Sequence, residues 1–399
     1  MKGLIELHGE AEREVYLDSE NSGLIFPEAL EKLVKAYSEA GYGNPSITHK
    51  PGWESYEIIY QASEKFSRIL NASPEELAYT HGATEANNLA ILGSARANKT
   101  DRRKIITSSI EHLSLIFPAE RLQEQGYRIV KTPVDGEGFI VQDLLEKEVD
   151  DHTFLVSIGA VNHEIGVIQD LKGLVELVKD QDSSILFHTD MADALGRIRI
   201  NLKELNVDLA SFSSHKVYGP KGAGLLYARE GVNLEPVIHG QLSSQRLWPG
   251  VENIPAIAGF AKAAESMDNL DKFRLVRLRD RLIEGVTSQV EDVILNGPKG
   301  SGRAPDNANI SFLYVEGEAL IVELSMKGIY ASSGSACTSR ILQPSHVLLA
   351  IGRRYEEAHG SLLMKVTPFH VEEDVDYVLM HIPQGVARLR SLSPIRKGR

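Results

Sequence analysis

The stretch Ser184-Ile185-Leu186-Phe187-His188-Thr189-Asp190 decides the fold class of this chain, because a short apolar run ends there in polar residues. Further along, Leu209-Ala210-Ser211-Phe212-Ser213-Ser214-His215-Lys216 repeats the same pattern. Between about residues 76 and 230, β-rich runs of this kind alternate with amphipathic helical stretches. That alternation predicts an α/β fold, with a mostly parallel sheet and helices on both of its faces.

The runs that have the length and composition of β-strands predict a seven-stranded sheet. They are Glu76 to Thr80, Lys104 to Ser108, Arg128 to Val134, Thr153 to Val161, Ser184 to Asp190, Leu209 to Ser214 and Ala223 to Ala228. Helices are expected between them. Leu171, Leu174 and Val178, for example, recur at the spacing that places them on one helical face.

Beyond residue 254 the pattern changes to α+β, which predicts a smaller second domain. Residues 254–289 predict one long linking helical stretch. Residues 292–296 and 309–315 are expected to be strands, residues 318–326 a helix, and residues 372–392 a terminal helical stretch that Pro383 interrupts. A solvated basic face is expected for the arginines of the linking stretch, Arg274, Arg277, Arg279 and Arg281. Residues 14–70 are expected to cross between the two domains.

Composition excludes several classes of function. Lys plus Arg number 43 and Asp plus Glu number 55, and the resulting net charge of −12 argues against nucleic acid as a partner. No window approaches the roughly 18 apolar residues of a membrane span, so no membrane partner is expected. The single cysteine, Cys337, excludes an internal disulfide and a cysteine-cage metal site. We expect no metal site and a reducing, cytoplasmic location.

Polar residues follow several of the predicted strands, at the edge where ligands bind in open α/β sheets. His81-Gly82-Ala83-Thr84-Glu85 opens a helix, where free amides and a hydroxyl can hold a phosphate. Glu111-His112, His188-Thr189-Asp190 and Ser213-Ser214-His215-Lys216 follow three other strands. A lysine amine and a carboxylate near a phosphate site are what pyridoxal phosphate requires of a protein.

Each of these residues taken alone has a simpler structural interpretation. Asp190 could cap a helix, His112 could be a satisfied polar side chain, and Lys216 could be solvated. The order in which these residues follow one another along the chain, taken together, favours a cofactor site over these separate structural roles. No rival motif competes with it, because the chain has no G-x-G-x-x-G that opens a helix, no Walker A sequence and no H-E-x-x-H.

The motif from Ser211 to Gly222 closely resembles the Schiff-base lysine motif of the NifS/IscS cysteine desulfurases, in the class V aminotransferase group of fold-type I enzymes. The same resemblance is carried by Gly82-Ala83-Thr84-Glu85, Glu111-His112, Asn162-His163-Glu164-Ile165-Gly166, His188-Thr189-Asp190, and Ser332-Ser333-Gly334-Ser335-Ala336-Cys337-Thr338-Ser339. It extends from about Tyr16 to Pro394. It implies residues 21–255 as the large cofactor-binding domain. Residues 1–20 and 256–399 would form the small domain, the latter with the linking helix and the cysteine loop.

The resemblance implies pyridoxal 5'-phosphate as the cofactor and gives the matching residues roles. Lys216 would form the Schiff base, Asp190 would bind the pyridine nitrogen, and His112 would stack on the ring. The cofactor site would also include Gly82, Ala83, His163 and Asp193, with Thr84, Ser213 and His215 at the phosphate. Cys337 would be the nucleophile that takes sulfur from cysteine and leaves alanine and a persulfide, and a polar, glycine-containing loop suits that role.

Several matching positions depart from the family pattern, and they cluster at the site. Leu363 stands where the family has the arginine that binds the substrate carboxylate, and Lys365 or Arg246 would be imperfect substitutes. His163 replaces an asparagine, and Asp193 replaces the glutamine that bonds the cofactor's phenolic oxygen. Further replacements are Trp248 for an arginine, Val251 for a threonine lent to the partner subunit's phosphate, and Asn21-Ser22-Gly23 for Ala-Thr-Thr.

Three hypotheses follow. The first is a cysteine desulfurase with a remodelled substrate anchor, which acts in sulfur transfer such as iron-sulfur cluster assembly. The second is a pyridoxal-phosphate lyase or transferase for another substrate, as Leu363 and Trp248 suggest. The third is an inactive paralogue that serves as scaffold or persulfide carrier. The expected partners are L-cysteine or another amino acid, a sulfur acceptor or iron-sulfur scaffold protein, and a second copy of the chain in a homodimer.

Overall fold

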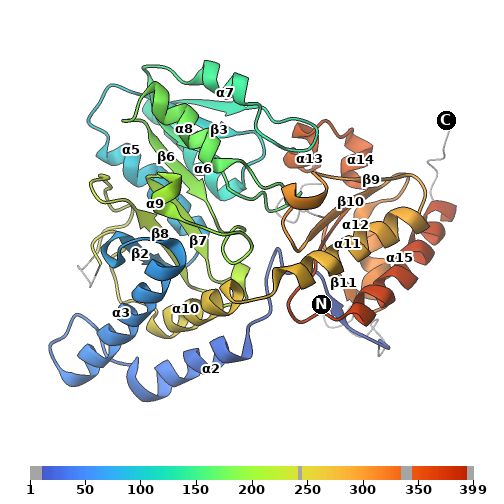
Figure 1. Cartoon of the computed structure of the whole chain (residues 1–399), viewed down its shortest axis with the longest axis horizontal. Coiled ribbons are helices and arrows are strands. Elements are labelled where there is room, and N and C mark those ends of the chain that lie inside the picture. Colours follow the sequence, from blue (N-terminus) through green and yellow to red (C-terminus); the bar gives the residue numbers. More distant parts are fainter. Residues whose placement is uncertain (1–10, 241–244, 334–343, 393–399) are drawn as a thin grey trace.

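The structure is a computed structural model that describes residues 11–240, 245–333 and 344–392. Within these ranges the largest sheet has seven strands in the order β2-β8-β7-β6-β5-β3-β4 (Figure 1). Its strands are β2 (Leu77–Thr80), β3 (Lys104–Ser108), β4 (Arg128–Thr132), β5 (Thr153–Ser157), β6 (Leu186–Asp190), β7 (Leu209–Ser213) and β8 (Gly224–Ala228). Strand β8 runs antiparallel to β7 and β2, and the other neighbours are parallel. The predicted mostly parallel α/β sheet is confirmed.

Both faces of this sheet are covered by helices, because successive residues of a strand join different hydrophobic clusters. Ile106 of β3 packs in a cluster with residues of α3 (Lys50–Leu70). Ile105, its neighbour, packs in a second cluster with residues of α6 (Leu113–Arg121). Alternation of this kind is what a strand buried on both sides requires.

The remaining helices of the large sheet region connect its strands or pack beside them. They are α2 (Pro27–Lys35), α4 (Ala83–Asn88), α5 (Ser94–Ala97), α7 (Gln142–Glu148), α8 (Leu171–Gln181), α9 (Leu202–Leu205) and α10 (Ile254–Asp268). Helices α2, α3 and α10 pack together at the lower left of Figure 1. None of the helices in the described ranges combines the length and hydropathy that crossing a bilayer requires.

A second, smaller region lies to the right in Figure 1 and has its own hydrophobic core. Its antiparallel sheet has the order β12-β10-β9. The elements there are β9 (Val293–Leu295), β10 (Asn307–Phe312), β12 (Ser361–Lys365), α11 (Lys272–Gln289), α12 (Gly317–Ser325), α13 (His346–Ala350), α14 (Tyr355–His359) and α15 (Glu372–Leu392). The predicted smaller α+β part is confirmed, while the domain boundaries remain a prediction.

The N-terminal segment reaches both regions, as expected for residues 14–70. Strand β1 (Val15–Tyr16) pairs in parallel with β11 (Ile329–Tyr330), and Val15 belongs to the smaller core. Helices α2 and α3 then pack against α10 beside the large sheet. The segment between β1 and α2 therefore passes from one region to the other.

Three expectations about helices were wrong. The linking stretch is two helices, α10 and α11, and the side chain of Asp271 caps the second by accepting from the backbone N of Phe273. Helix α15 runs through Pro383 without a break, because the buried side chains of Ile382 and Val386 on either side hold it against the core. Arg279 is not solvated: it is 1% exposed, and its guanidinium donates to two backbone carbonyls.

Candidate active site

A cavity of about 480 Å³ lies where β2, β3, β6 and β7 of the large sheet end. The positions predicted to contact a cofactor all line it: Gly82, Ala83, Thr84, His112, His163, Asp190, Asp193, Ser213, His215 and Lys216. The carboxyl ends of parallel strands meet at one edge of a sheet, which explains why residues far apart in the chain converge there. Cys337 lies outside the described residues.

Asp190 ends strand β6 and is held by hydrogen bonds on both of its oxygens. Oδ1 accepts from the backbone N of Ala192 at 2.9 Å, and Oδ2 accepts from Asn87 Nδ2 at 2.7 Å. Burial raises the pKa of Asp190, although these two hydrogen bonds oppose the rise. The carboxyl is thus fixed in position, and a cationic partner in the cavity would favour its ionised form.

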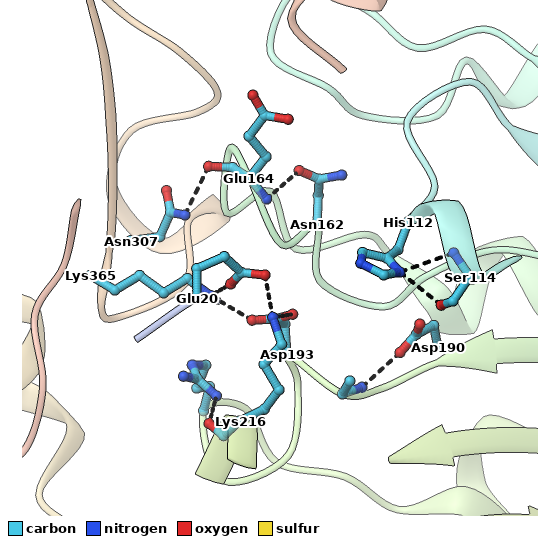
Figure 2. A network of polar contacts seen from close by, with 12 residues as sticks. Glu20, His112, Ser114, Asn162, Glu164, Asp190, Asp193, Lys216, Asn307 and Lys365 are labelled. Carbon is cyan, nitrogen blue, oxygen red and sulfur yellow. Dashed lines mark hydrogen bonds and ion pairs between the residues drawn. The ribbon is translucent and has the colours of Figure 1, made fainter. Parts of the chain in front are cut away.

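His112 caps helix α6 through its own ring. Its Nδ1 accepts from the backbone N of Ser114 at 3.1 Å and lies 2.7 Å from Ser114 Oγ. Because Nδ1 is an acceptor, the neutral ring carries its proton on Nε2. Ser114 Oγ also accepts from Asn87 Nδ2 at 2.9 Å, so one chain of hydrogen bonds joins His112 to Asp190. Figure 2 shows the part of this chain between His112 and Ser114.

His163 meets His112 edge to face, with ring centroids 4.9 Å apart. Burial lowers the pKa of His163 well below its ordinary value, and the nearby His112 and Lys216 add to that effect. Asn162 positions the loop, since its Oδ1 accepts from the backbone N of Glu164 and its Nδ2 donates to Ile110 O. His163 is therefore a neutral side chain beside the predicted stacking histidine.

Lys216 lies in a short 3-10 helix, His215–Val217, directly after β7. Its Nζ forms an ion pair with Glu20 and lies 3.1 Å from Asp193 Oδ2. Lys365 Nζ, from β12, pairs with the same two carboxylates and lies 2.5 Å from Asp193 Oδ1. We call these four residues the charge cluster, and Figure 2 shows them meeting at the centre of the site.

The charge cluster is buried, with each of its four residues at most 8% exposed. Burial alone would raise the pKa of Asp193, but the ammonium groups of Lys216 and Lys365 hold it well below its ordinary value. Burial alone would lower the pKa of Lys365, but Asp193 and Glu20 raise it. The cluster therefore joins two carboxyl groups to two amino groups, and these contacts favour the ionised forms of Asp193 and Lys365.

Arg197 holds the backbone of Lys216 by a hydrogen bond to its carbonyl oxygen. Its Nη1 donates to Lys216 O at 2.9 Å, and its Nε donates to Asp306 Oδ2 at 2.6 Å. Arg197 and Asp306 are 4% and 0% exposed, so this pair is closed to solvent. Since Asp306 directly precedes β10, the pair connects the lysine to the smaller sheet.

The turn at Gly82 is held by a close approach of two backbones. A Cβ added to Gly224, at the start of β8, would lie 2.6 Å from the Cα of Gly82. A Cβ added to Gly82 itself would meet nothing within 4 Å. Gly224 is therefore required for packing, whereas Gly82 leaves open space beside the cavity it lines.

Residues 15–378 of the chain match the family described as Aminotransferase class-V. The chain belongs to this family. It is 41% identical over 387 residues to cysteine desulfurase IscS of Clostridium botulinum, with 96% of this chain and 97% of the relative covered. It is 42% identical over 371 residues to cysteine desulfurase IscS 1 of Archaeoglobus fulgidus, which covers 92% of this chain and 96% of that relative.

Solved structures agree with the class-V assignment. One, a NifS-like protein, has a TM-score of 0.88 and 33% identity, and covers 94% of this chain and 100% of its own. Another, described as SspA in complex with cysteine, has a TM-score of 0.78 and 31% identity, and covers 89% and 99%. The predicted resemblance and the fold-type I architecture are confirmed. Class-V aminotransferases use pyridoxal phosphate, so the predicted cofactor is confirmed for the family.

The residues of this class-V chain fit that cofactor. His215 lines the cavity, and its buried Nδ1 has no hydrogen-bond partner in the described structure, so this nitrogen is available to a phosphate. Burial lowers the pKa of His215 to about 4, so the imidazole is neutral and would act by hydrogen bonding. Lys216 and Asp190 supply the amine and the carboxylate that such a cofactor requires.

Two buried carboxyl groups, those of Glu111 and Glu164, belong to residues that line the cavity, and the sequence alone predicts no role for them. Burial raises the pKa of Glu111 to about 7 and that of Glu164 to about 8. Glu111 accepts from Gly159 N at 2.9 Å, and Glu164 Oε2 accepts from Ser345 Oγ at 2.6 Å. Glu164 Oε1 has no partner. Both groups can hold a proton near neutral pH.

Two described residues that come after Cys337 in the sequence, Ser345 and His346, lie at the cavity. Ser345 donates to Glu164 and caps α13 by accepting from the backbone N of Val347 and Leu348. His346 Nε2 lies 2.9 Å from Glu111 O. Both Ser345 and His346 line the cavity, which places the described end of the cysteine-bearing segment at the site.

The residues that depart from the family pattern differ in whether they line the cavity. Leu363 is fully buried in β12 and does not line the cavity. Arg246 also lies outside the lining, and Lys365 is engaged in the charge cluster. Among the described residues that line the cavity, Lys216 is the only lysine or arginine. No free guanidinium replaces the lost arginine within the described part of the site.

The loop around Trp248 borders a second cavity of about 380 Å³ that shares His81 and Glu85 with the first. Trp248 Nε1 lies 3.4 Å from His81 Nδ1, and the two rings meet edge to face. Val251 is 68% exposed beside this cavity. Trp248 therefore covers the edge of the predicted phosphate turn.

Sequence reasoning missed three residues of the site: Glu20, Asn87 and Ser114. Asn87 lies one helical turn after Ala83, a spacing that places both on one face of the helix and could have indicated it. Ser114 follows His112 by two residues, which is a common capping distance. Glu20 carried no local signal, because only the fold brings it to Lys216.

Proposed function

We propose that this chain is a pyridoxal-phosphate-dependent cysteine desulfurase, which removes sulfur from L-cysteine and leaves alanine. The observation that carries the proposal is that Lys216, Asp190 and His112 line one cavity at the ends of the large sheet. The near-full-length likeness to proteins named cysteine desulfurase supports it. Bound in this cavity, pyridoxal phosphate supplies a carbonyl that captures amines and a ring that withdraws electrons.

The chain's own residues would do the remaining work. Asp190, fixed by Asn87 and Ala192, would hold a negative charge for the pyridine nitrogen. Lys216 would supply the amine that bonds the cofactor. His112, with its proton on Nε2, would hold a proton near the reacting atoms. Thr84, Ser213 and His215 would bind the phosphate.

Cys337 would accept the sulfur. Its thiolate attacks the substrate sulfur, so that an S–S bond forms and the substrate C–S bond breaks with its electron pair on carbon. That carbon then takes a proton and the product is alanine, while Cys337 carries a persulfide. The docking of Ser345 and His346 on the cavity wall supports a nucleophile delivered from this segment.

The test loads the purified protein with pyridoxal phosphate and adds L-cysteine. We expect alanine release and one persulfide, located on Cys337 by mass spectrometry, and neither from Cys337→Ser. Lys216→Ala should lose the visible band of the bound cofactor. A loaded wild-type protein that releases no alanine and forms no persulfide would refute the proposal.

A second candidate function has a specific observation in its favour. With Leu363 buried and Lys216 the only lysine or arginine among the described lining residues, the site suits a substrate that is less anionic than an amino acid. A lyase or transferase of that kind would change its absorbance with such a substrate and remain silent with cysteine. The same loaded protein tests both candidates.

Further parts of the proposal concern partners and location. A sulfur acceptor or iron-sulfur scaffold protein would take the persulfide sulfur. A homodimer is supported by large apolar side chains exposed on α2 and α3, among them Val34, Trp53 and Tyr56. Sedimentation equilibrium would test the dimer. The cytoplasmic location, expected from the single cysteine, stays a prediction.

A further inference from the structure

The charge cluster surrounds the nitrogen that matters most for the proposed chemistry. Lys216 Nζ contacts the carboxylates of Glu20 and Asp193, and each of those carboxylates also contacts Lys365 Nζ. Each of the two carboxylates therefore contacts both of the lysine side chains. Two carboxylates and the single ammonium of Lys365 leave one net negative charge facing Lys216 Nζ.

We propose that Glu20, Asp193 and Lys365 set the charge on Lys216 Nζ, so that this nitrogen stays protonated when it is bonded to the carbonyl carbon of pyridoxal phosphate. This inference rests on the proposed function, because it requires that bond. A protonated Schiff base is the form that amines attack most readily. Glu20, Asp193 and Lys365 act through Lys216 and are positioning residues.

The other charged groups around Lys216 do not cancel this effect. Arg197 contacts the backbone O of Lys216, but its charge is paired with Asp306. The charge of Lys216 acts on two titratable rings, those of His163 and His215, and burial lowers the pKa of both, that of His215 to about 4. Tyr218 lies directly after the lysine's turn, and burial raises its pKa to about 12. Between pH 6 and 10 the side chains of His163, His215 and Tyr218 keep constant charge, whereas Glu111 and Glu164, on the wall of the same cavity, titrate within that range because their pKa values are about 7 and about 8.

The burial of the cluster makes its charges effective. Glu20, Asp193 and Lys216 are 7%, 5% and 8% exposed, and Lys365 is 2% exposed, so water screens their interactions little. An opposite charge within about 4–6 Å typically shifts a titration by about one to three pH units. Glu20 and Asp193 should therefore extend the protonated Schiff base to higher pH, and Lys365 should moderate them.

The test measures the visible band of the Schiff base against pH in protein loaded with pyridoxal phosphate. Relative to the wild type, the midpoint should fall by about one pH unit or more in Glu20→Gln and in Asp193→Asn. It should rise in Lys365→Met, which leaves two carboxylates facing one nitrogen. Opposite directions are the signature of charge, because loss of structure alone would not produce them.

Two further variants keep the test decisive. Glu20→Gln combined with Lys365→Met removes one charge of each sign, so it should fold even where Lys365→Met does not, and its midpoint should return to within about half a unit of the wild type. Glu164→Gln removes a carboxyl from the same cavity without touching Lys216 and should shift the midpoint by less than half a unit.

The outcomes distinguish a failure of this inference from a failure of the proposed function. A visible band whose midpoint stays fixed in Glu20→Gln and Asp193→Asn, or moves the same way in all the charge-cluster variants, would overturn this inference alone. A wild-type protein that forms no band at all with pyridoxal phosphate would overturn the proposed function and this inference with it.

Discussion

Asn87 Nδ2 donates a hydrogen bond of 2.7 Å to Asp190 Oδ2, and the same amide nitrogen lies 2.9 Å from Ser114 Oγ. Asn87 is fully buried in helix α4, so water cannot replace these contacts. Through Ser114 the contact extends to His112. One amide thus sets the position of the carboxylate and of the histidine that the proposed chemistry uses.

We expect Asn87→Ala to weaken pyridoxal phosphate binding by about five- to 160-fold, because the lost hydrogen bonds to Asp190 and Ser114 are worth about 1–3 kcal/mol. A titration of the apo protein with the cofactor, followed by absorbance, measures the change. Asn88→Ala is the matched control, since within the described part of the chain Asn88 donates to Thr84 O one turn away in the same helix and not to Asp190 or Ser114. Equal affinities for the two variants would contradict the role given to Asn87.

The raised pKa of Glu111 predicts a stability that depends on pH. Burial raises this pKa from 4.5 to about 7. Between these two values the folded state binds more protons than the unfolded state, so the free energy of unfolding falls as pH rises. The contribution is present below pH 4.5 and lost by about pH 7, and it amounts to about 3 kcal/mol at most.

Glu111→Gln removes this dependence while keeping a neutral side chain that can bond Ser108 and Gly159. We expect the variant to be more stable than the wild type at pH 8 and similar to it at pH 5, as measured by urea unfolding at both values. Glu75→Gln, at an exposed position, should behave like the wild type. A variant that is less stable than the wild type at pH 8 would contradict this prediction, because it would show that the ionised Glu111 carboxylate stabilises the fold.

The buried pair of Arg197 and Asp306 predicts a large loss of stability when one partner is removed. Arg197→Met leaves the Asp306 carboxylate unpaired inside the protein and removes a donor from Lys216 O. We expect the free energy of unfolding to fall by about 3–5 kcal/mol. Chemical denaturation measures it.

Arg281→Met provides the comparison for Arg197→Met. Arg281 pairs with Asp376 at the surface, where their side chains are 47% and 50% exposed. Surface pairs of this kind contribute little to stability, so its unfolding transition should match that of the wild type. A similar loss in both variants would mean that burial does not govern these pairs.

Much of the fold follows from local sequence. The strands of the large sheet were found within a few residues because each is a short apolar run that ends in polar residues, as at Leu186–Asp190. The same pattern brought Lys216 and Asp190 to one cavity, since parallel strands end at one edge. A helix break was predicted wrongly at Pro383, because tertiary packing keeps α15 helical where the residue itself predicts an interruption.

The charge cluster could not be predicted from sequence in the same way. Glu20 lies near the N-terminus and Lys365 near the end of the small sheet, and neither belongs to a local pattern. Lys365 was considered as a substrate anchor, but Glu20 and Asp193 engage its ammonium group. Only the fold shows that a lysine is already committed to carboxylates from distant segments.

The contact between Gly224 and Gly82 has a consequence for how ligands are recognised. The backbones of strand β8 and of the turn beside the cavity touch directly, with no side chain between them. The turn therefore cannot change its conformation around a bound ligand unless the whole strand shifts, and a packed sheet resists such a shift. We expect this wall of the cavity to act as a rigid template that accepts an anionic group of matching size and rejects larger ones.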